Sequence, residues 1–146
     1  MNKPSRRFFQ SGFTLLEVLV TMIIIAVGLM GFAAMMVNSL KNNRTAMQRS
    51  LATFYAYDII DCMRVNQVAA TANAYTRTFG DAVPALGGTV ANNDLNLWLN
   101  ALSRALPSGQ ANISVVGSTV TVQIRWNENI NTGDSGLHTW QTVSTL

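Results

Sequence analysis

The side chains best suited to chemistry are two carboxylates three positions apart. Asp58 and Asp61 stand in the segment YDIIDCMRVN, and Arg64 follows three residues after Asp61. Paired carboxylates can perform general acid–base catalysis, whereas an acid and an arginine at this spacing on a helix form a salt bridge. No nucleophile or set of metal ligands stands nearby in the sequence. We therefore predict a structural or intersubunit salt bridge, and no catalytic residues.

Other reactive side chains are scarce. Cys62 is the only cysteine and His138 the only histidine among 146 residues. One cysteine excludes an internal disulfide, and a zinc site needs more nitrogen or sulfur ligands than these two residues provide. Cys62 lies on an apolar stripe and is expected to be a buried thiol, and no glycine-rich phosphate-binding motif occurs. The sequence therefore predicts a protein that is not an enzyme and has no metal or cofactor.

The positive charge of the chain is concentrated at its start. Ten basic residues face seven acidic ones, and three of the basic residues lie before Gly12, where there is no acidic residue. Removing residues 1–12 leaves seven residues of each sign, so the high isoelectric point does not predict a nucleic-acid partner. The alternative is a local DNA-binding patch formed by Arg77, Arg104 and Arg125.

A long apolar run follows this basic start. Residues 18–37 carry no charge, and 20 residues of helix are about 30 Å long, enough to cross a membrane. The basic residues before the run predict a cytoplasmic N-terminus, with the chain after residue 37 across the membrane. The small pair Ser11-Gly12 precedes the run, whereas a secretory signal has its cleavage site after the run. This order favours removal of the leader alone.

The segment GFTLLEVLVTMIIIAVGLMGF resembles the signal of type IV pilins and of type II secretion pseudopilins. The resemblance implies cleavage by the prepilin peptidase between Gly12 and Phe13 and methylation of the new amine on Phe13. It also implies that Glu17 pairs with the N-terminal amine of a neighbouring subunit during assembly. A charge in the bilayer costs about 2.5 kcal/mol or more without a partner. The alternative is a glutamate that reaches the headgroup water.

Periodicity predicts the remaining elements. Apolar residues that recur in steps of three, four and seven positions predict one helix from Phe13 to about Asn66. Its apolar face is made by Leu40, Met47, Leu51, Phe54, Tyr55, Ile59, Cys62 and Met63. Residues 67–93 read as mostly loop. A second helix is expected from a cap at Asn93 or Asp94 to a stop at Pro107.

The last 40 residues change to a period of two. Residues 111–126 predict a hairpin that turns at Gly117-Ser118. Residues 127–136 predict a polar turn, and residues 137–146 a third strand. The apolar face of such a sheet needs a cover, which the long helix can supply. We therefore expect an α+β, type IV pilin-like fold, in which a long N-terminal helix with a membrane-spanning first half packs on a small antiparallel sheet.

The segments YDIIDCMRVN and VQIRWNE resemble those of PilV-type minor pilins. This resemblance implies a leader at 1–12, a transmembrane half-helix at 13–37 and a periplasmic domain at 38–146, carried in the inner membrane and then in the pilus at the cell surface. It implies a tip-located or priming subunit that serves adhesion, twitching motility or DNA uptake. Its partners would be other minor pilins, the major pilin, the prepilin peptidase and the assembly platform. The alternatives are a minor pseudopilin, a membrane-anchored periplasmic enzyme and a DNA-binding competence pilin.

Overall fold

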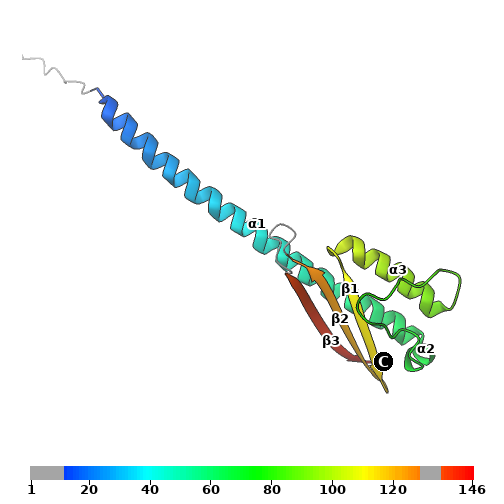
Figure 1. Cartoon of the computed structure of the whole chain (residues 1–146). Helices are drawn as coiled ribbons and strands as arrows, with labels where there is room; N and C mark the ends of the chain where they lie inside the picture. The colour runs from blue at the N-terminus through cyan, green and yellow to red at the C-terminus, as the bar shows by residue number, and fades with distance from the viewer. Residues whose placement is uncertain (1–11, 129–135) are drawn as a thin grey trace, which may run out of the picture. The chain divides into compact units, whose positions relative to one another are not determined.

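The structure is a computed structural model, and it describes residues 12–128 and 136–146. Its first element, helix α1, runs from Leu15 to Val65 (Figure 1). The predicted helix from 13 to about 66 is therefore confirmed to within two residues. No proline occurs between Pro4 and Pro84 to interrupt it. At its start, the backbone carbonyl of Thr14 accepts a hydrogen bond of 3.0 Å from the amide of Glu17.

The chain forms two compact units that divide within α1, after residue 42. The described part of the first unit consists of residues 12–14, which have no regular structure, and the first part of α1. The second unit contains the end of α1, two further helices and a sheet. Its elements are α2 (Gln67–Thr71), α3 (Val90–Ala105), β1 (Gln110–Val116), β2 (Thr119–Asn127) and β3 (Leu137–Thr145).

The three strands form an antiparallel meander in the order β1-β2-β3. The β1–β2 hairpin turns at Gly117, whose φ of +62° is one that glycine adopts without strain. Alternate β2 residues are buried, as the period of two predicted: Val120, Val122, Ile124 and Trp126. The predicted sheet is thus confirmed, and most of the predicted polar turn at 127–136 lies outside the described residues.

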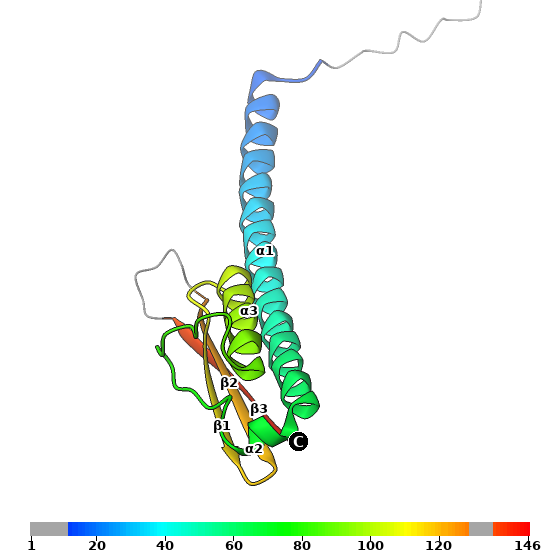
Figure 2. The ribbon, with the colours of Figure 1, turned by 90° about the vertical axis from the view of Figure 1, so that its right-hand side faces the viewer.

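Within the second unit, the end of α1 and α3 lie side by side on one face of the sheet (Figure 2). The buried α1 residues are Gln48, Ala52, Ala56, Ile59, Ile60 and Met63. The predicted apolar face of α1 is partly wrong, because Met47 and Phe54 are 64% and 63% exposed. Leu40, in the first unit, is also exposed. The face that packs in the second unit carries two alanines, which allow a close approach of the helix backbone.

Helix α3 begins before the predicted cap. Thr89 is the N-cap, and its Oγ1 accepts the amide of Asn92 at 3.2 Å. The prediction of Asn93 or Asp94 as the helix cap is wrong because both side chains have other partners. Asn93 accepts a hydrogen bond from the amide of Gly87, and Asp94 accepts one from the hydroxyl of Tyr75. The predicted apolar face is confirmed, since five side chains are buried: Leu95, Trp98, Leu99, Leu102 and Leu106. Leu106 ends the helix, directly before Pro107.

Candidate functional site

The first candidate site is the start of the described chain. Gly12 and Phe13 precede α1 in no regular structure, and the side chain of Phe13 is 85% exposed. The peptide bond between them is therefore open to an enzyme that binds an extended backbone. Residues 1–11, most of the predicted leader, lie outside the described residues.

Glu17 lies in the first turn of α1 and is exposed. An acidic side chain is favourable there, because the amide groups of the first turn carry partial positive charge. Thr14 caps the same turn, with Oγ1 3.3 Å from the amide nitrogen of Glu17. Glu17 thus lies in the helical turn that begins directly after Phe13.

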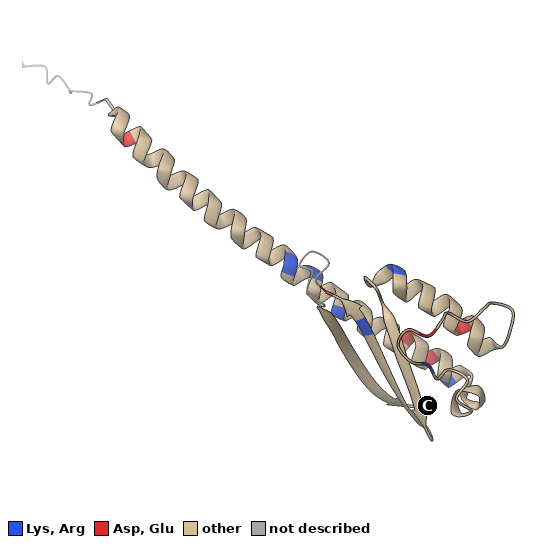
Figure 3. Ribbon diagram, in the orientation of Figure 1, with Lys and Arg blue, Asp and Glu red and all other residues tan. Residues whose placement is uncertain are grey.

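The apolar stretch that follows Glu17 has no packing partner among the described residues of its own unit, 12–42. Its large side chains are all exposed, from 42% for Val18 to 75% for Met30. Figure 3 shows this stretch without a charged residue after Glu17. By length and composition α1 can cross a membrane. A helix that is apolar on all sides is stable in lipid or against other helices.

The second candidate site is the acidic end of α1. Arg64 Nη1 lies 2.8 Å from Asp61 Oδ1, which makes a salt bridge within the chain. The same guanidinium donates to Ser144 Oγ at 2.8 Å and so joins the end of α1 to β3. Asp58 makes no ion pair with any residue that the structure describes. The three residues predicted together thus divide into a bonded pair and a carboxylate without a cationic partner.

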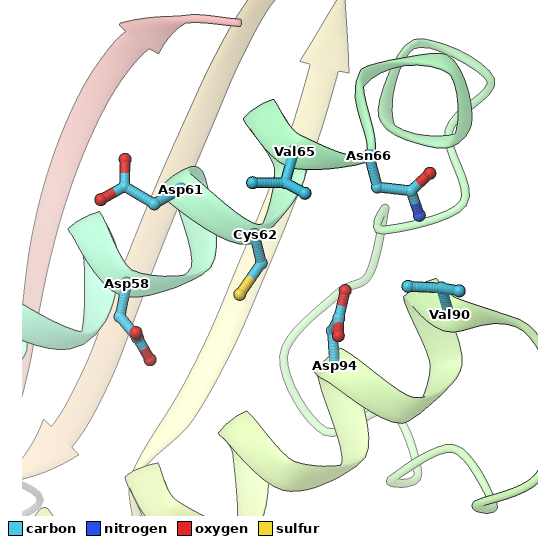
Figure 4. A pocket seen from close by; sticks show the side chains of 7 residues that line it. All are labelled: Asp58, Asp61, Cys62, Val65, Asn66, Val90 and Asp94. Atoms are coloured by element: carbon cyan, nitrogen blue, oxygen red, sulfur yellow. The ribbon is translucent and has the colours of Figure 1, made fainter.

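A pocket of about 340 Å³ lies between the end of α1 and α3. Figure 4 shows the side chains that line it: Asp58, Asp61, Cys62, Val65, Asn66, Val90 and Asp94. Asp94 points from α3 toward α1, and the Cys62 sulfur is directed into the space between the helices. The sequence did not identify Asp94 as part of this site, because only the packing of α3 brings it beside Asp58.

Two ionisable groups lie at or beside the pocket: Cys62 lines it, and the Tyr75 hydroxyl donates a hydrogen bond to the lining residue Asp94. Burial, and then the hydrogen bond to Asp94, raise the pKa of Tyr75 to about 12. Burial, and then the nearby carboxylates of Asp94 and Asp58, raise the pKa of the Cys62 thiol. Both groups therefore stay protonated. Cys62 was expected to be a buried thiol, but it is only half-buried. The described residues contain no cluster of acidic, histidine or cysteine ligands suited to a metal ion.

The three arginines of the alternative DNA-binding patch do not form an exposed basic surface. Arg77 is only 7% exposed and donates to the carbonyl of Asp81 at 2.8 Å. The guanidinium of Arg125 lies 4.2 Å from the centre of the Phe79 ring and donates to Gln110. Only Arg104 is exposed. The alternative of a shared patch therefore has little support, because two of its three arginines are used within the fold.

His138 also has a structural role that the sequence did not reveal. It lies on β3, with its Nε2 2.5 Å from Oε2 of Glu128, which directly follows β2. Arg49 of α1 approaches the same carboxylate at 3.7 Å. These contacts hold the start of β3 to the rest of the second unit.

Comparison with known protein families finds a match at the N-terminus. Residues 7–33 match the model of the prokaryotic N-terminal methylation motif, the type IV pilin-like signal. The matched segment includes Gly12, Phe13 and Glu17. It supports a general role as a pilin or pseudopilin, which implies processing by a prepilin peptidase and assembly with other pilins in the membrane. No curated protein and no solved structure matches the chain.

Proposed function

We propose that this chain is a minor pilin of a type IV pilus that helps to prime and assemble the filament. One observation carries the proposal: the methylation motif coincides with an exposed, uncharged helical segment that begins directly after Glu17. The motif supplies the processing site, and the helix supplies an element that is stable both in a bilayer and in an apolar filament core. Transfer from one environment to the other costs little hydrophobic burial.

Glu17 gives this transfer its specificity. Cleavage after Gly12 creates a positive amine on Phe13, four residues before Glu17. In our proposal the carboxylate pairs with the amine of a neighbouring subunit, so that one negative charge neutralises one positive charge per chain. Because the pair forms only at one axial offset between two helices, it sets the register of assembly.

The cellular setting follows from this role. Before assembly the subunit spans the inner membrane once, with residues 38–146 in the periplasm. It is then carried into the pilus, where its partners are other minor pilins and the major pilin. The prepilin peptidase and the assembly platform act on it in the membrane. The segments YDIIDCMRVN and VQIRWNE favour a PilV-type subunit, which connects the protein with a tip location, adhesion, twitching motility or DNA uptake.

A minor pseudopilin of a type II secretion system is the second candidate. It shares the methylation motif, the long helix and the sheet. Co-purification separates the two: minor pilins among the partners support a pilus, and secretion pseudopilins support the alternative. A membrane-anchored enzyme has less support, because the raised pKa of Cys62, the thiol that lines the pocket, makes it a poor nucleophile at neutral pH.

Processing is the direct test of the proposal. We expect the protein from wild-type membranes to begin at N-methylated Phe13, and the protein from a strain without prepilin peptidase to begin at Met1. Gly12→Leu should give the unprocessed chain in both strains, because a bulky side chain blocks a site that accepts an extended glycine. Intact mass and the N-terminal peptide give the answer. A chain that begins at Met1 in the wild type would rule out the pilin assignment.

Asp58 is proposed to bind a basic side chain of a neighbouring subunit. Its carboxylate lines an acidic pocket, whereas Asp61 is already paired with Arg64. We expect Asp58→Asn to lower the amount of this protein in sheared pili about two- to fivefold, as partly exposed ion pairs contribute up to about 1 kcal/mol. Asp61→Asn is the matched control and should have less effect on incorporation. Equal recovery of Asp58→Asn and wild type would contradict this role.

A further inference from the structure

The two edges of the sheet differ. At the β1 edge, Arg77 and Ile113 exchange two backbone hydrogen bonds of 3.0 Å, so a loop segment covers part of this edge. At the other edge, β3 pairs with β2 along its whole length and with no further strand among residues 12–128 and 136–146 (Figure 1). The carbonyl of Thr145, at the end of β3, accepts hydrogen bonds from the Arg64 guanidinium at 3.4 Å. The other outer backbone groups of β3 have no partner among the described residues and are available to another chain.

Strand β3 lacks the features by which proteins protect an open edge. It has nine residues, pairs with β2 in an unbroken register, and contains no proline, lysine, arginine or acidic residue. Natural edge strands are usually short, bulged, charged or interrupted by proline, because an open, regular edge invites pairing. Two of its apolar side chains, Leu137 and Val143, are 51% and 56% exposed. An edge of this kind is suited to a partner strand.

A ladder of side-chain amides crosses the sheet and ends at this edge. Asn112 donates to Gln123 at 2.7 Å, and Gln123 donates to Gln141 at 2.8 Å. The three residues are direct cross-strand partners on β1, β2 and β3. Because each amide donates toward β3, the Nε2 group of Gln141 is left as a donor without a partner in the described chain. The next member of the ladder must supply an acceptor oxygen.

The edge is also held in place from within the second unit. Arg64 donates to Ser144 Oγ near the end of β3, and His138 is paired with Glu128 near its start. The final residue, Leu146, donates its amide to the carbonyl of Ser118 at 2.9 Å. A strand fixed in this way needs little further ordering when a partner adds to it, which favours binding.

We infer that the β3 edge binds an extended strand of a different protein subunit, with an amide, hydroxyl or carboxylate oxygen opposite Gln141. The inference rests on the proposed function, because the partner is taken to be another subunit of the same filament. Addition of a strand to an open edge supplies main-chain hydrogen bonds, and the side-chain ladder adds specificity. A partner with an amide, hydroxyl or carboxylate side chain at the facing position (asparagine, glutamine, serine, threonine, aspartate or glutamate) fits this requirement.

The direction of the ladder disfavours a second copy of this chain. Gln141 is the central residue of Leu137–Thr145, so a two-fold antiparallel pair of β3 strands matched end to end would place Gln141 opposite itself. With both amides in the ladder orientation, two Nε2 donors would then face each other. A different chain that presents an acceptor satisfies both the backbone and the ladder.

Photo-crosslinking in cells that assemble the filament tests the inference. A photoreactive phenylalanine derivative replaces Val143 on β3 or, as the matched control, Val116 on β1, which is 78% exposed. We expect position 143 to give a covalent adduct with an extended segment of another subunit, and position 116 to give none. In the chain with the probe at 143, Gln141→Glu should lower the adduct yield about fivefold or more. This change retains the acceptor oxygen for Gln123 but replaces the outward donor with an acceptor.

The outcomes separate the strand site from the proposed function. An adduct between two copies of this chain, or no adduct at 143 in a chain that is processed and incorporated, would overturn the strand site alone. An adduct with a protein outside the filament, from a chain that still begins at Met1, would retain the strand site and overturn the minor-pilin assignment. An adduct that Gln141→Glu does not change would overturn the role of the ladder.

Discussion

Glu17→Ala should leave the protein in the membrane at its normal level and remove it from the filament. Loss of the carboxylate makes insertion easier, since a charge in the bilayer costs about 2.5 kcal/mol or more. Assembly loses the interaction that neutralises the amine on Phe13 of a neighbouring subunit. We expect incorporation to fall about tenfold or more, which corresponds to a loss of about 1.4 kcal/mol in pairing. The measurement is the ratio of this protein in sheared pili to that in membranes.

Two further substitutions identify the cause. Glu17→Gln keeps the size of the side chain and removes only the charge, so it should reproduce the defect of Glu17→Ala. Glu17→Asp keeps the charge on a shorter side chain and should restore part of the incorporation. The alternative, a glutamate that only reaches headgroup water, predicts normal incorporation of all three variants. That result would remove Glu17 from the assembly mechanism.

The elements with a strong period could be predicted from the sequence. The apolar run and the absence of proline defined α1 to within two residues of Leu15–Val65. The alternation of apolar and polar residues defined β2, because Val120, Val122 and Ile124 lie on one face and the threonine and glutamine between them lie on the other. In both elements the local pattern and the tertiary environment agree, so one period is enough to place them.

Features that depend on packing between distant segments could not be predicted in the same way. Ala52 and Ala56 are buried, whereas the larger Met47 and Phe54 are exposed, because the packing of distant segments, and not side-chain size, decides which face of α1 is covered. Asn93 is a plausible helix cap by sequence, but in the folded chain its side chain accepts a hydrogen bond from the amide of Gly87.

The candidate site follows the same division. Gly12, Phe13 and Glu17 are adjacent in sequence, so a local motif was sufficient to find them. The pocket is different, because Asp94 meets Asp58 only through the contact between two helices. The amide ladder joins Asn112, Gln123 and Gln141 through the strand register, which alternation alone does not define.

Trp98→Ala should be among the most destabilising single substitutions in the second unit. Trp98 is 4% exposed between α3 and α1, and its Nε1 donates to the carbonyl of Tyr55 at 2.9 Å. Truncation removes a large buried side chain and this link between the two helices, at a cost of about 3–5 kcal/mol. For a domain of about 100 residues, such a loss lowers the melting temperature by roughly 12 °C or more. Circular dichroism of the full chain in detergent measures it.

Two variants separate packing from the hydrogen bond. Trp98→Phe keeps most of the buried ring and loses the donor, so we expect a smaller loss of about 1–2 kcal/mol. Leu97→Ala changes a neighbouring residue of the same helix that is 65% exposed, and it should change the free energy of unfolding by about 0.5 kcal/mol or less. Equal melting temperatures for Trp98→Ala and Leu97→Ala would mean that α3 does not pack on α1 through Trp98. The pocket between these helices would then lose its basis, because the position of Asp94 beside Asp58 depends on that packing.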